Sequence, residues 1–346
     1  MPEGTATVAR PRRTQATIQA GSLWTLARRH PWPVVGVIAL VAVLANGDDF
    51  QFHLLDLICI FGILACSLNL VVGYAGQVSL CQASFFGIGA YVTAVLVKHG
   101  WSYWATVPVG MTLAAAAGVL VGLPALKIRS HYLGMVTIGA AYLFSAVVGT
   151  WTTTGAATGL YGIKEVDFFG YALADNLSFM PVAVGALVLS LLTMNQLVRS
   201  HIGRAWMSLR DDDIAAESFG VRPLTYKVLV FALAAAYAGL AGGLFAEFSS
   251  AISPASFGVD VSIQALIMIV VGGLASLPGA VVGAAIVILL PAYLTSFSRL
   301  ENVVYAAAII VVMIVTPGGL VGIRKGSTAR LGGWARNRLV VWRRVP

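Results

Sequence analysis

Charge is what this sequence has least of. Only 10% of its 346 residues are Asp, Glu, Lys or Arg, whereas 58% are hydrophobic. Because a soluble domain carries about 25% charged residues, this composition excludes an ordinary soluble protein. We therefore expect an all-helical, polytopic integral membrane protein.

Cysteine is scarce as well, and the three that occur lie in apolar stretches. Cys59 and Cys66 are too close along one helix to form a disulfide without distorting it. We expect these two and Cys81 to be reduced and to fill space as small hydrophobic side chains, with no metal or redox role.

Sequence motifs for catalysis, metal binding and nucleotide binding are missing too. The chain has no G-x-x-x-x-G-K-[ST] phosphate loop, no His or Cys spacing suited to a metal, and no Ser, His and Asp cluster at a nucleophile elbow. We expect no catalytic residue, no metal site and no nucleotide hydrolysis by this chain alone. The five histidines fall at the ends of apolar segments, where an interfacial position is expected: His30, His53, His99, His131 and His201.

Long apolar runs are what the sequence has in abundance. A spanning helix needs about 20 apolar residues, and ten candidate segments occur, at 32–45, 54–72, 78–97, 104–126, 132–150, 180–198, 228–248, 262–277, 279–296 and 302–316. The first is short, and Val43, Leu44 and Ala45 resemble a signal-peptide cleavage site. Because the polar leader of 1–31 is much longer than a usual signal n-region, we interpret 32–45 as a retained span.

The basic residues indicate how the segments are oriented. Lys and Arg gather in 1–31, 127–131, 199–227 and 324–346, which fall on one side if the spans alternate, whereas loops on the other side carry acids such as Asp49, Asp56 and Asp260. Cytoplasmic loops are enriched in Lys and Arg. The net charge of +8 therefore indicates orientation, not nucleic-acid binding. We predict cytoplasmic tails at 1–31 and 324–346 flanking a transmembrane domain at 32–323.

Two places in these runs are rich in glycine. The stretch GYAGQVSLCQASFFGIGAY spans 73–91, and 262–296 is almost one apolar run interrupted near 273–280. Glycine allows helices to approach closely or to break, and a broken helix is tolerated at membrane depth only inside protein. We predict a broken or re-entrant segment near 73–91, a tight turn near 273–280, and packing roles for Gly73, Gly76, Gly87, Gly89, Gly272, Gly273, Gly279 and Gly283.

The first of these stretches also carries polar side chains. In hydrocarbon, an amide or hydroxyl needs a hydrogen-bond partner, which can be a neighbouring helix, exposed backbone or a solute. Ser79 and Gln82 are three residues apart, a spacing that predicts one shared helical face. Two interpretations stay open: polar contacts between packed helices, or a substrate path lined by Gln77, Ser79, Gln82, Ser84 and Phe85.

Acidic residues are nearly absent from the predicted spans. Glu247 is the main candidate, at the outer end of its segment, where it is either a solvated helix terminus or a gating residue. Ion-coupled carriers keep ionisable groups in the membrane. This scarcity argues against such a carrier and predicts that energy for transport comes from a partner.

The longest loop between spans is GRAWMSLRDDDIAAESFGVRPLTYK, residues 203–227. Its alternating charges predict a helix, and Gly220 and Pro223 predict where it ends. Ile214, Ala215, Ala216 and Phe219 form a modest apolar stripe. Two readings stay open: a solvated loop helix, or a helix that inserts into a groove of another protein.

Three blocks of this sequence resemble LivM-type permease subunits of branched-chain amino-acid ABC importers, and related urea and amide permeases follow closely. They are LNLVVGYAGQVSLCQASFFGIGAY (68–91), GRAWMSLRDDDIAAESFGV with the following YKVLVFALAAAYAGLAGGLFA (203–246), and SPASFGVDVSIQALIMIVVGGLASLPGAVVGA (253–284). The segment TGLYGI (158–163) is similar to a loop of the family.

The resemblance implies a permease in the inner cytoplasmic membrane that imports Leu, Ile and Val by alternating access. It implies four kinds of partner: a second, LivH-type permease, two cytoplasmic ATPases that bind ATP and Mg, an extracytoplasmic solute-binding protein, and membrane lipids. It also implies that 203–221 is a coupling helix docking on an ATPase, through Arg204, Asp211, Asp212, Ala215, Ala216, Glu217 and Gly220.

Two departures leave the solute open. Cys81 stands where the family has glycine, and Ala140, Ala141 and Tyr142 replace a Phe-Ala-Glu-like stretch. Urea, short amides or another small solute therefore stay as alternatives. A lone ion-coupled carrier and a non-transporting scaffold are the rivals from other classes.

Overall fold

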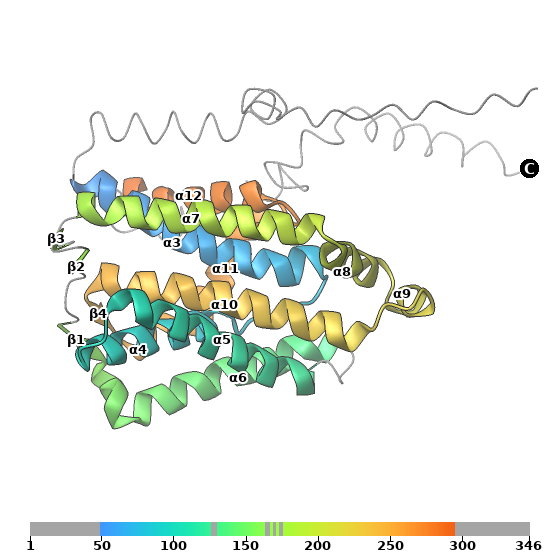
Figure 1. The fold of residues 1–346 in the computed structure, drawn as a ribbon, viewed down its shortest axis with the longest axis horizontal. Coiled ribbons are helices and arrows are strands. Elements are labelled where there is room, and N and C mark those ends of the chain that lie inside the picture. Colours follow the sequence, from blue (N-terminus) through green and yellow to red (C-terminus); the bar gives the residue numbers. More distant parts are fainter. Residues whose placement is uncertain (1–48, 126–129, 163–166, 169–170, 173–175, 295–346) are drawn as a thin grey trace, which may run out of the picture. The chain divides into compact units, whose positions relative to one another are not determined.

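The computed structural model describes residues 49–125, 130–162, 167–168, 171–172 and 176–294, all within one compact unit (Figure 1). The predicted tails and the segments 32–45 and 302–316 lie outside the described residues. We keep the labels of Figure 1, in which the first described helix is α3.

Helices dominate the described chain. The α-helices are α3 (Asp49–Asn69), α4 (Gln82–Lys98), α5 (Tyr103–Ala125), α6 (Ser130–Thr150), α7 (Asn176–Arg199), α8 (His201–Asp211), α9 (Asp213–Ser218), α10 (Pro223–Ser249), α11 (Val259–Gly272) and α12 (Leu277–Leu294). A π-helical turn, η1 (Leu70–Tyr74), continues α3, and 3₁₀ turns occur at η2 (Thr152–Thr154), η3 (Ala156–Thr158) and η4 (Pro254–Phe257).

Six of the described helical segments are long and apolar enough to cross a membrane. They are Asp49–Tyr74, Tyr103–Leu123, Leu133–Thr150, Ser178–Arg199, Pro223–Ser249 and Pro254–Gly272, and shorter apolar helices occur at Gln82–Lys98 and Leu277–Tyr293. The helical, multi-pass membrane protein expected from composition is confirmed. The total of ten segments stays a prediction.

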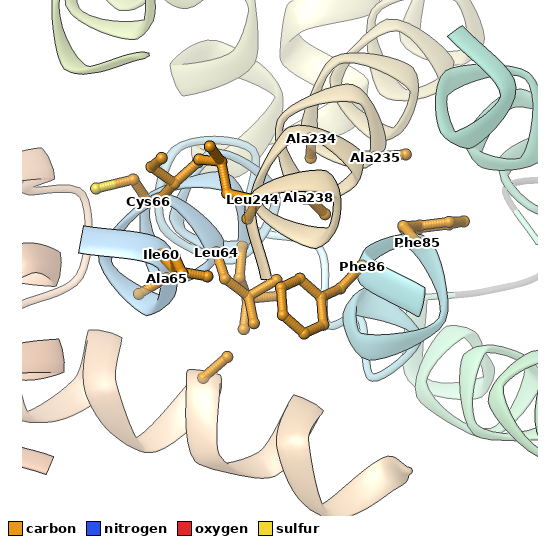
Figure 2. Packing of buried hydrophobic residues seen from close by; sticks show 14 of the residues in the cluster. Ile60, Leu64, Ala65, Cys66, Phe85, Phe86, Ala234, Ala235, Ala238 and Leu244 are labelled. Carbon is orange, nitrogen blue, oxygen red and sulfur yellow. The ribbon is translucent and has the colours of Figure 1, made fainter. Parts of the chain in front are cut away.

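The core forms where α3, α4 and α10 meet. α10 packs against α5, α4 and α3, while α12 packs against α3 and α11, and α7 packs against α3. Figure 2 shows Phe86 of α4 directed toward α3 and α10, where its ring lies 6.0 Å from that of Phe61 and 5.3 Å from that of Phe245 (centroid distances). Because α3 and α10 are the most buried of the span-length helices, this seam is the centre of the unit.

Glycines bring α4 and α10 into backbone contact. A Cβ placed on Gly89 would lie 2.0 Å from the carbonyl oxygen of Gly239, and one on Gly242 would lie 1.9 Å from that of Phe86. No side chain fits at such distances, so the two helices pack at the separation that glycine allows. Gly239 and Gly242 were not predicted; the run AGLAGG in the sequence of α10 is the signal that could have identified them.

Short strands join the loops at one end of the helices. β1 (Leu160–Tyr161) pairs antiparallel with β4 (Ala251–Ile252), and β2 (Asp167–Phe168) pairs with β3 (Tyr171–Ala172). β1 belongs to the TGLYGI segment and lies beside the residues that follow α10. The pairing holds two loops together that are about 90 residues apart in the sequence.

Candidate functional site

The chain leaves helical conformation between α3 and α4. The π-helical turn η1 ends at Tyr74, Gly76 has a left-handed φ of 67°, and α4 begins only at Gln82. The expected apolar segment 78–97 is therefore helical only in part. Ser79 precedes the helix, so the prediction that Ser79 and Gln82 share a helical face is wrong.

Side chains of other helices satisfy backbone groups of this break and of the first turn of α4. The N–H of Leu80 donates to Oγ1 of Thr137 on α6 at 3.1 Å, and the N–H of Ala83 donates to Oγ of Ser262 on α11 at 2.9 Å. Broken helices at membrane depth need partners of this kind, because hydrocarbon offers none. The break is thus held between α6 and α11.

Gln82, the first residue of α4, joins three helices. Its Nε2 donates to Oγ of Ser67 on α3 at 2.6 Å and to the carbonyl oxygen of Ala234 on α10 at 3.2 Å, and the side chain is fully buried. In this conformation the amide makes contacts between helices, the first of the two interpretations above. Its Oε1 has no hydrogen-bond partner within the described chain.

The other predicted path residues are also buried, but they do not share one set of contacts. Gln77 Nε2 donates to the carbonyl oxygen of Ala75 at 3.4 Å, and Ser79 Oγ lies 3.4 Å from Cys81 Sγ. Ser84 and Phe85 are 4% and 2% exposed, and the Ser84 hydroxyl lacks a partner among the described residues. These four side chains stay candidates for a path that opens in another conformation.

The three cysteines behave as space-filling side chains. All are buried and none forms a disulfide. Cys66 Sγ donates to the carbonyl oxygen of Leu277 at 3.4 Å, which joins α3 to the start of α12. The described residues contain no group of three or more His, Cys, Asp or Glu side chains that could hold a metal ion.

The turn between α11 and α12 lies against the break after α3. Asn69, at the end of α3, accepts a hydrogen bond from the N–H of Ala275 and donates one to the carbonyl oxygen of Ser276, both at 2.9 Å. A Cβ on Gly73 would lie 2.6 Å from the N of Ala275. The two glycine-rich interruptions of the sequence are therefore in direct contact.

The same turn depends on close packing between its own helices. A Cβ on Gly272 would lie 1.9 Å from the carbonyl oxygen of Gly279, and one on Gly283 would lie 1.9 Å from that of Met268. Gly273 has a φ of 124°, a region favourable only to glycine. The hydrogen bonds of Asn69 to this turn were not predicted from the sequence. The signal that could have identified them is a single asparagine within an apolar run.

The predicted single helix in 203–221 is two helices. α8 and α9 are separated at Asp212, which has an extended backbone and whose Oδ1 accepts hydrogen bonds from the N–H groups of Ile214 and Ala215, at 2.9 and 3.1 Å. An aspartate that caps a helix in this way starts a new helix. The expectation of one continuous amphipathic helix is therefore wrong, and Asp212 has a structural role.

α8 is anchored and α9 is exposed. Trp206 of α8 is fully buried, and its Nε1 donates to the carbonyl oxygen of Tyr226 at 2.9 Å. On α9 and just after it, Ile214 is 79% exposed and Phe219 is 89% exposed, while Ala216 is buried. Of the expected apolar stripe, two large side chains thus face outward on a short helical projection.

The remaining predicted coupling residues lie on α8, on α9 and just after α9. Arg204, Asp211, Ala215 and Glu217 are exposed, and Gly220 has a left-handed φ of 85° where the chain turns toward α10. The ion pair Asp213–Lys227, at 2.5 Å, fastens α9 to the first turn of α10. This is a surface contact that orients α9.

An acid lies well inside a span. Asp56 was counted with the loop acids although it falls just inside the predicted segment 54–72, and the structure places it in α3, where its side chain is fully buried. Seven residues separate it from Asp49, a rise of about 10 Å along the helix. Neither carboxyl oxygen has a hydrogen-bond partner among the described residues. Glu247, the acid that was predicted, lies in the last turn of α10 and is 8% exposed.

Comparisons with known proteins identify the family. Residues 51–315 match the profile of the family described as branched-chain amino acid transport system, permease component. The chain belongs to this family. It is 33% identical over 286 residues to the high-affinity branched-chain amino acid transport system permease protein LivM of Escherichia coli, covering 75% of this chain and 67% of that protein.

Other relatives extend the comparison. The LivM protein of Salmonella typhimurium is 32% identical over 302 residues, which cover 80% of this chain and 71% of the relative. The LivH permease of Escherichia coli is 24% identical over 281 residues, which cover 76% of this chain and 91% of the relative. No solved structure matches the chain.

Proposed function

We propose that this chain is a membrane-spanning subunit of an ATP-driven importer of branched-chain amino acids. The observation that carries the proposal is the pair of exposed apolar side chains on the α9 projection, Ile214 and Phe219, in a chain of the permease family. Exposed apolar groups on a short helix are typical of docking into a partner's groove. Energy from ATP bound by such a partner would drive transport.

The partners follow from the type of transport system. The similarity to both LivM and LivH supports a pair of related permeases, of which this chain would be the LivM-type member. Two ATPase subunits would bind ATP and Mg on the cytoplasmic side, and a solute-binding protein would deliver the amino acid on the other side. This chain would bind no cofactor and catalyse no reaction.

The charge distribution supports the orientation. The segment 199–227 is rich in Lys and Arg, as are the two tails, so we place all three in the cytoplasm. Ten membrane-embedded helices, with 1–31 and 324–346 as tails, satisfy this arrangement in the inner membrane. The break at residues 75–81 would then lie near the cytoplasmic end of α3.

The solute is proposed to be leucine, isoleucine or valine, with urea, short amides or another small solute as the alternative. Cys81, which stands where glycine is expected, is fully buried beside the break. Tyr142, in the segment that departs from the family, is 65% exposed on α6, so it faces lipid or the second permease. Neither side chain excludes a branched-chain amino acid.

Deletion and complementation test the proposal. Cells that lack this chain should lose ATP-dependent uptake of radiolabelled leucine, isoleucine and valine at micromolar concentration and regain it with the wild-type chain. Uptake that survives inactivation of the ATPases but collapses with a protonophore would instead support an ion-coupled carrier, for which Asp56 would be the candidate ionisable residue. Unchanged uptake after deletion would support a scaffold.

Docking is tested at α9. Ile214→Ser with Phe219→Ser should abolish co-purification of the ATPases while the chain stays in the membrane. Leu224→Ser supplies a matched control, because Leu224 is also exposed, at 44%, but lies on α10. Normal ATPase binding by the double variant would contradict the docking role.

A further inference from the structure

Arg210 connects the α8–α9 segment to the break in the membrane helices. From the last turn of α8, its Nη1 donates to the carbonyl oxygen of Gly73 at 2.5 Å, across 137 residues of sequence. Gly73 lies in the π-helical turn η1 and is buried. Helices leave their last carbonyl groups without internal partners, and here a charged side chain from another segment supplies one.

The aliphatic part of the Arg210 side chain also contacts the break itself. A Cβ on Gly76 would lie 2.8 Å from Cγ of Arg210 and 3.2 Å from its Cβ. Gly76 has the left-handed φ at which the chain turns away from the helix axis. Arg210 thus contacts both the end of η1 and the first residues of the break.

Asn69 continues the connection on the other side of η1. It binds the backbone of Ala275 and Ser276, in the turn between α11 and α12. A Cβ on Gly73 would lie 2.0 Å from Asn69 Oδ1, so Asn69 and Gly73 are in contact. Arg210, Gly73, Asn69 and Ala275 therefore form one continuous series of contacts from α8 to the α11–α12 turn.

α9 directly follows the turn of α8 that carries Arg210. Arg210 is two residues before Asp212, whose side chain caps α9, whereas the contact of Trp206 with α10 lies one turn earlier in α8. π-helical turns inside α-helices occur frequently at functional sites. A displacement of α9 therefore reaches η1 through one side chain.

We propose that Arg210 and Asn69 are positioning residues that couple the α8–α9 segment to both interruptions of the membrane helices, at residues 75–81 and 273–276. When α9 moves, Arg210 shifts η1, and Asn69 carries the shift to the α11–α12 turn. The break that carries Gln77 and Ser79 then changes its exposure. The inference rests on the proposed function, in which a partner ATPase moves α9.

The test uses the complete transporter in proteoliposomes: this chain, the second permease, the ATPases and the solute-binding protein. Leucine uptake and ATP hydrolysis are measured together. Arg210→Gln should lower the uptake per ATP by roughly tenfold, in the range by which residues along a coupling network change coupling. Arg210→Lys, which keeps a charged donor without the fork of the guanidinium, should give an intermediate ratio.

Controls separate coupling from folding. Arg222→Gln removes an exposed arginine from the same loop and should keep the wild-type ratio. Asn69→Ala should lower the ratio as Arg210→Gln does, and the double variant should be no worse than the more severe single one, because both side chains lie in one series. An unchanged ratio in Arg210→Gln, or an equal loss of uptake and hydrolysis in Arg210→Gln and Arg210→Lys, would overturn the proposal.

Thiol labelling of the break measures its conformation independently of transport. Val78 in the break is 48% exposed, and the native cysteines are buried, so Val78→Cys can be labelled selectively by a water-soluble thiol reagent. In the otherwise wild-type transporter its labelling rate should change between the nucleotide-free and ATP-bound states. With Arg210→Gln the difference should disappear, and its persistence would overturn the proposal. If the unaltered transporter takes up no leucine, the proposed function is wrong. This result differs from a failure of the coupling proposal, in which the unaltered transporter takes up leucine and the Arg210 variants behave like it.

Discussion

The two ends of α3 differ in whether their buried polar groups have hydrogen-bond partners among the described residues. At the end near α8, Asn69 and Gly73 exchange hydrogen bonds with the α11–α12 turn and with Arg210. At the other end Asp56 is fully buried, and its carboxyl oxygens have no partner among the described residues. The first arrangement joins three segments through hydrogen bonds, whereas the second buries a carboxyl group without that compensation, which costs free energy.

The surroundings of Asp56 reinforce the contrast. The ring of His53, one turn earlier, lies 4.6 Å from that of Phe248, and Phe248 lies 6.1 Å from Phe179 (centroid distances). Aromatic rings therefore lie near this end of α3, and no hydrogen bond from the described residues reaches the carboxyl group of Asp56. Substitution of Asn69 or Gly73 should therefore lower the stability of the protein, and substitution of Asp56 should raise it.

The largest effect is expected at Gly73. Gly73→Val places methyl groups where a Cβ alone would lie 2.6 Å from the N of Ala275, so η1 and the α11–α12 turn cannot both keep their positions. We expect no folded protein, measured as loss of the monodisperse peak in detergent gel filtration. Gly139→Ala is the control, because a Cβ there meets nothing within 4 Å. A monodisperse Gly73→Val protein would show that the contact is dispensable.

Asn69→Leu should have the next largest effect. It removes the hydrogen bond to the N–H of Ala275, and an unsatisfied donor of this kind costs about 1–3 kcal/mol. The carbonyl oxygen of Ser276 loses the Asn69 amide but still accepts a hydrogen bond from the N–H of Ala280. The thermal unfolding midpoint in detergent should fall clearly. Gln196→Leu on α7, where the glutamine is exposed, should leave the midpoint unchanged. Equal midpoints for Asn69→Leu and wild type would remove the distinction between the two ends.

Asp56→Leu should have the opposite sign. Replacing a buried, unpartnered carboxyl by an apolar group of similar size removes a desolvation cost and is expected to stabilise the protein by about 1–2 kcal/mol. The thermal midpoint should rise, and leucine uptake measured in parallel would show whether the residue is kept for transport. Asp49→Leu at the exposed first turn of α3 is the control. A lower midpoint for Asp56→Leu would mean that the carboxyl has a stabilising partner.

The smallest effect on stability is expected at α9. Phe219 is 89% exposed, and substitutions at exposed positions usually change stability by within about 0.5 kcal/mol. Phe219→Ser should therefore leave the thermal midpoint of the isolated chain unchanged. A fall comparable to that of Asn69→Leu would show that Phe219 packs against this chain itself.

The sequence predicted the helical membrane fold, because hydropathy is a local signal, and its glycines indicated an interruption within 73–91, of which the structure leaves only 75–81 outside a helix. It did not predict that Gln82 begins a helix, since whether residues 75–81 continue α3 depends on Thr137 and Ser262 from distant helices. It counted Asp56 with the loop acids for a related reason. An acid near the end of an apolar run indicates a boundary, and only the neighbouring helices show that α3 begins earlier.

The coupling segment was predicted by resemblance and composition, but its geometry was not. Charge alternation over 203–221 indicates a helix, and it cannot show that Asp212 turns inward to cap a second one. The sequence named the members of the apolar stripe, but it could not show that Ala216 is buried while Ile214 and Phe219 are exposed.

Three properties of this chain follow from composition, spacing and family resemblance alone. They are its membrane-spanning helices, the absence of a nucleotide-binding loop and its membership of the permease family. These are properties of local residue chemistry, which each segment carries wherever it lies. The contact between the two glycine-rich interruptions, the hydrogen bond from Arg210 to Gly73 and the burial of Asp56 depend on the tertiary structure. They join residues as much as 206 positions apart, and no local pattern specifies which distant backbone group a side chain will meet.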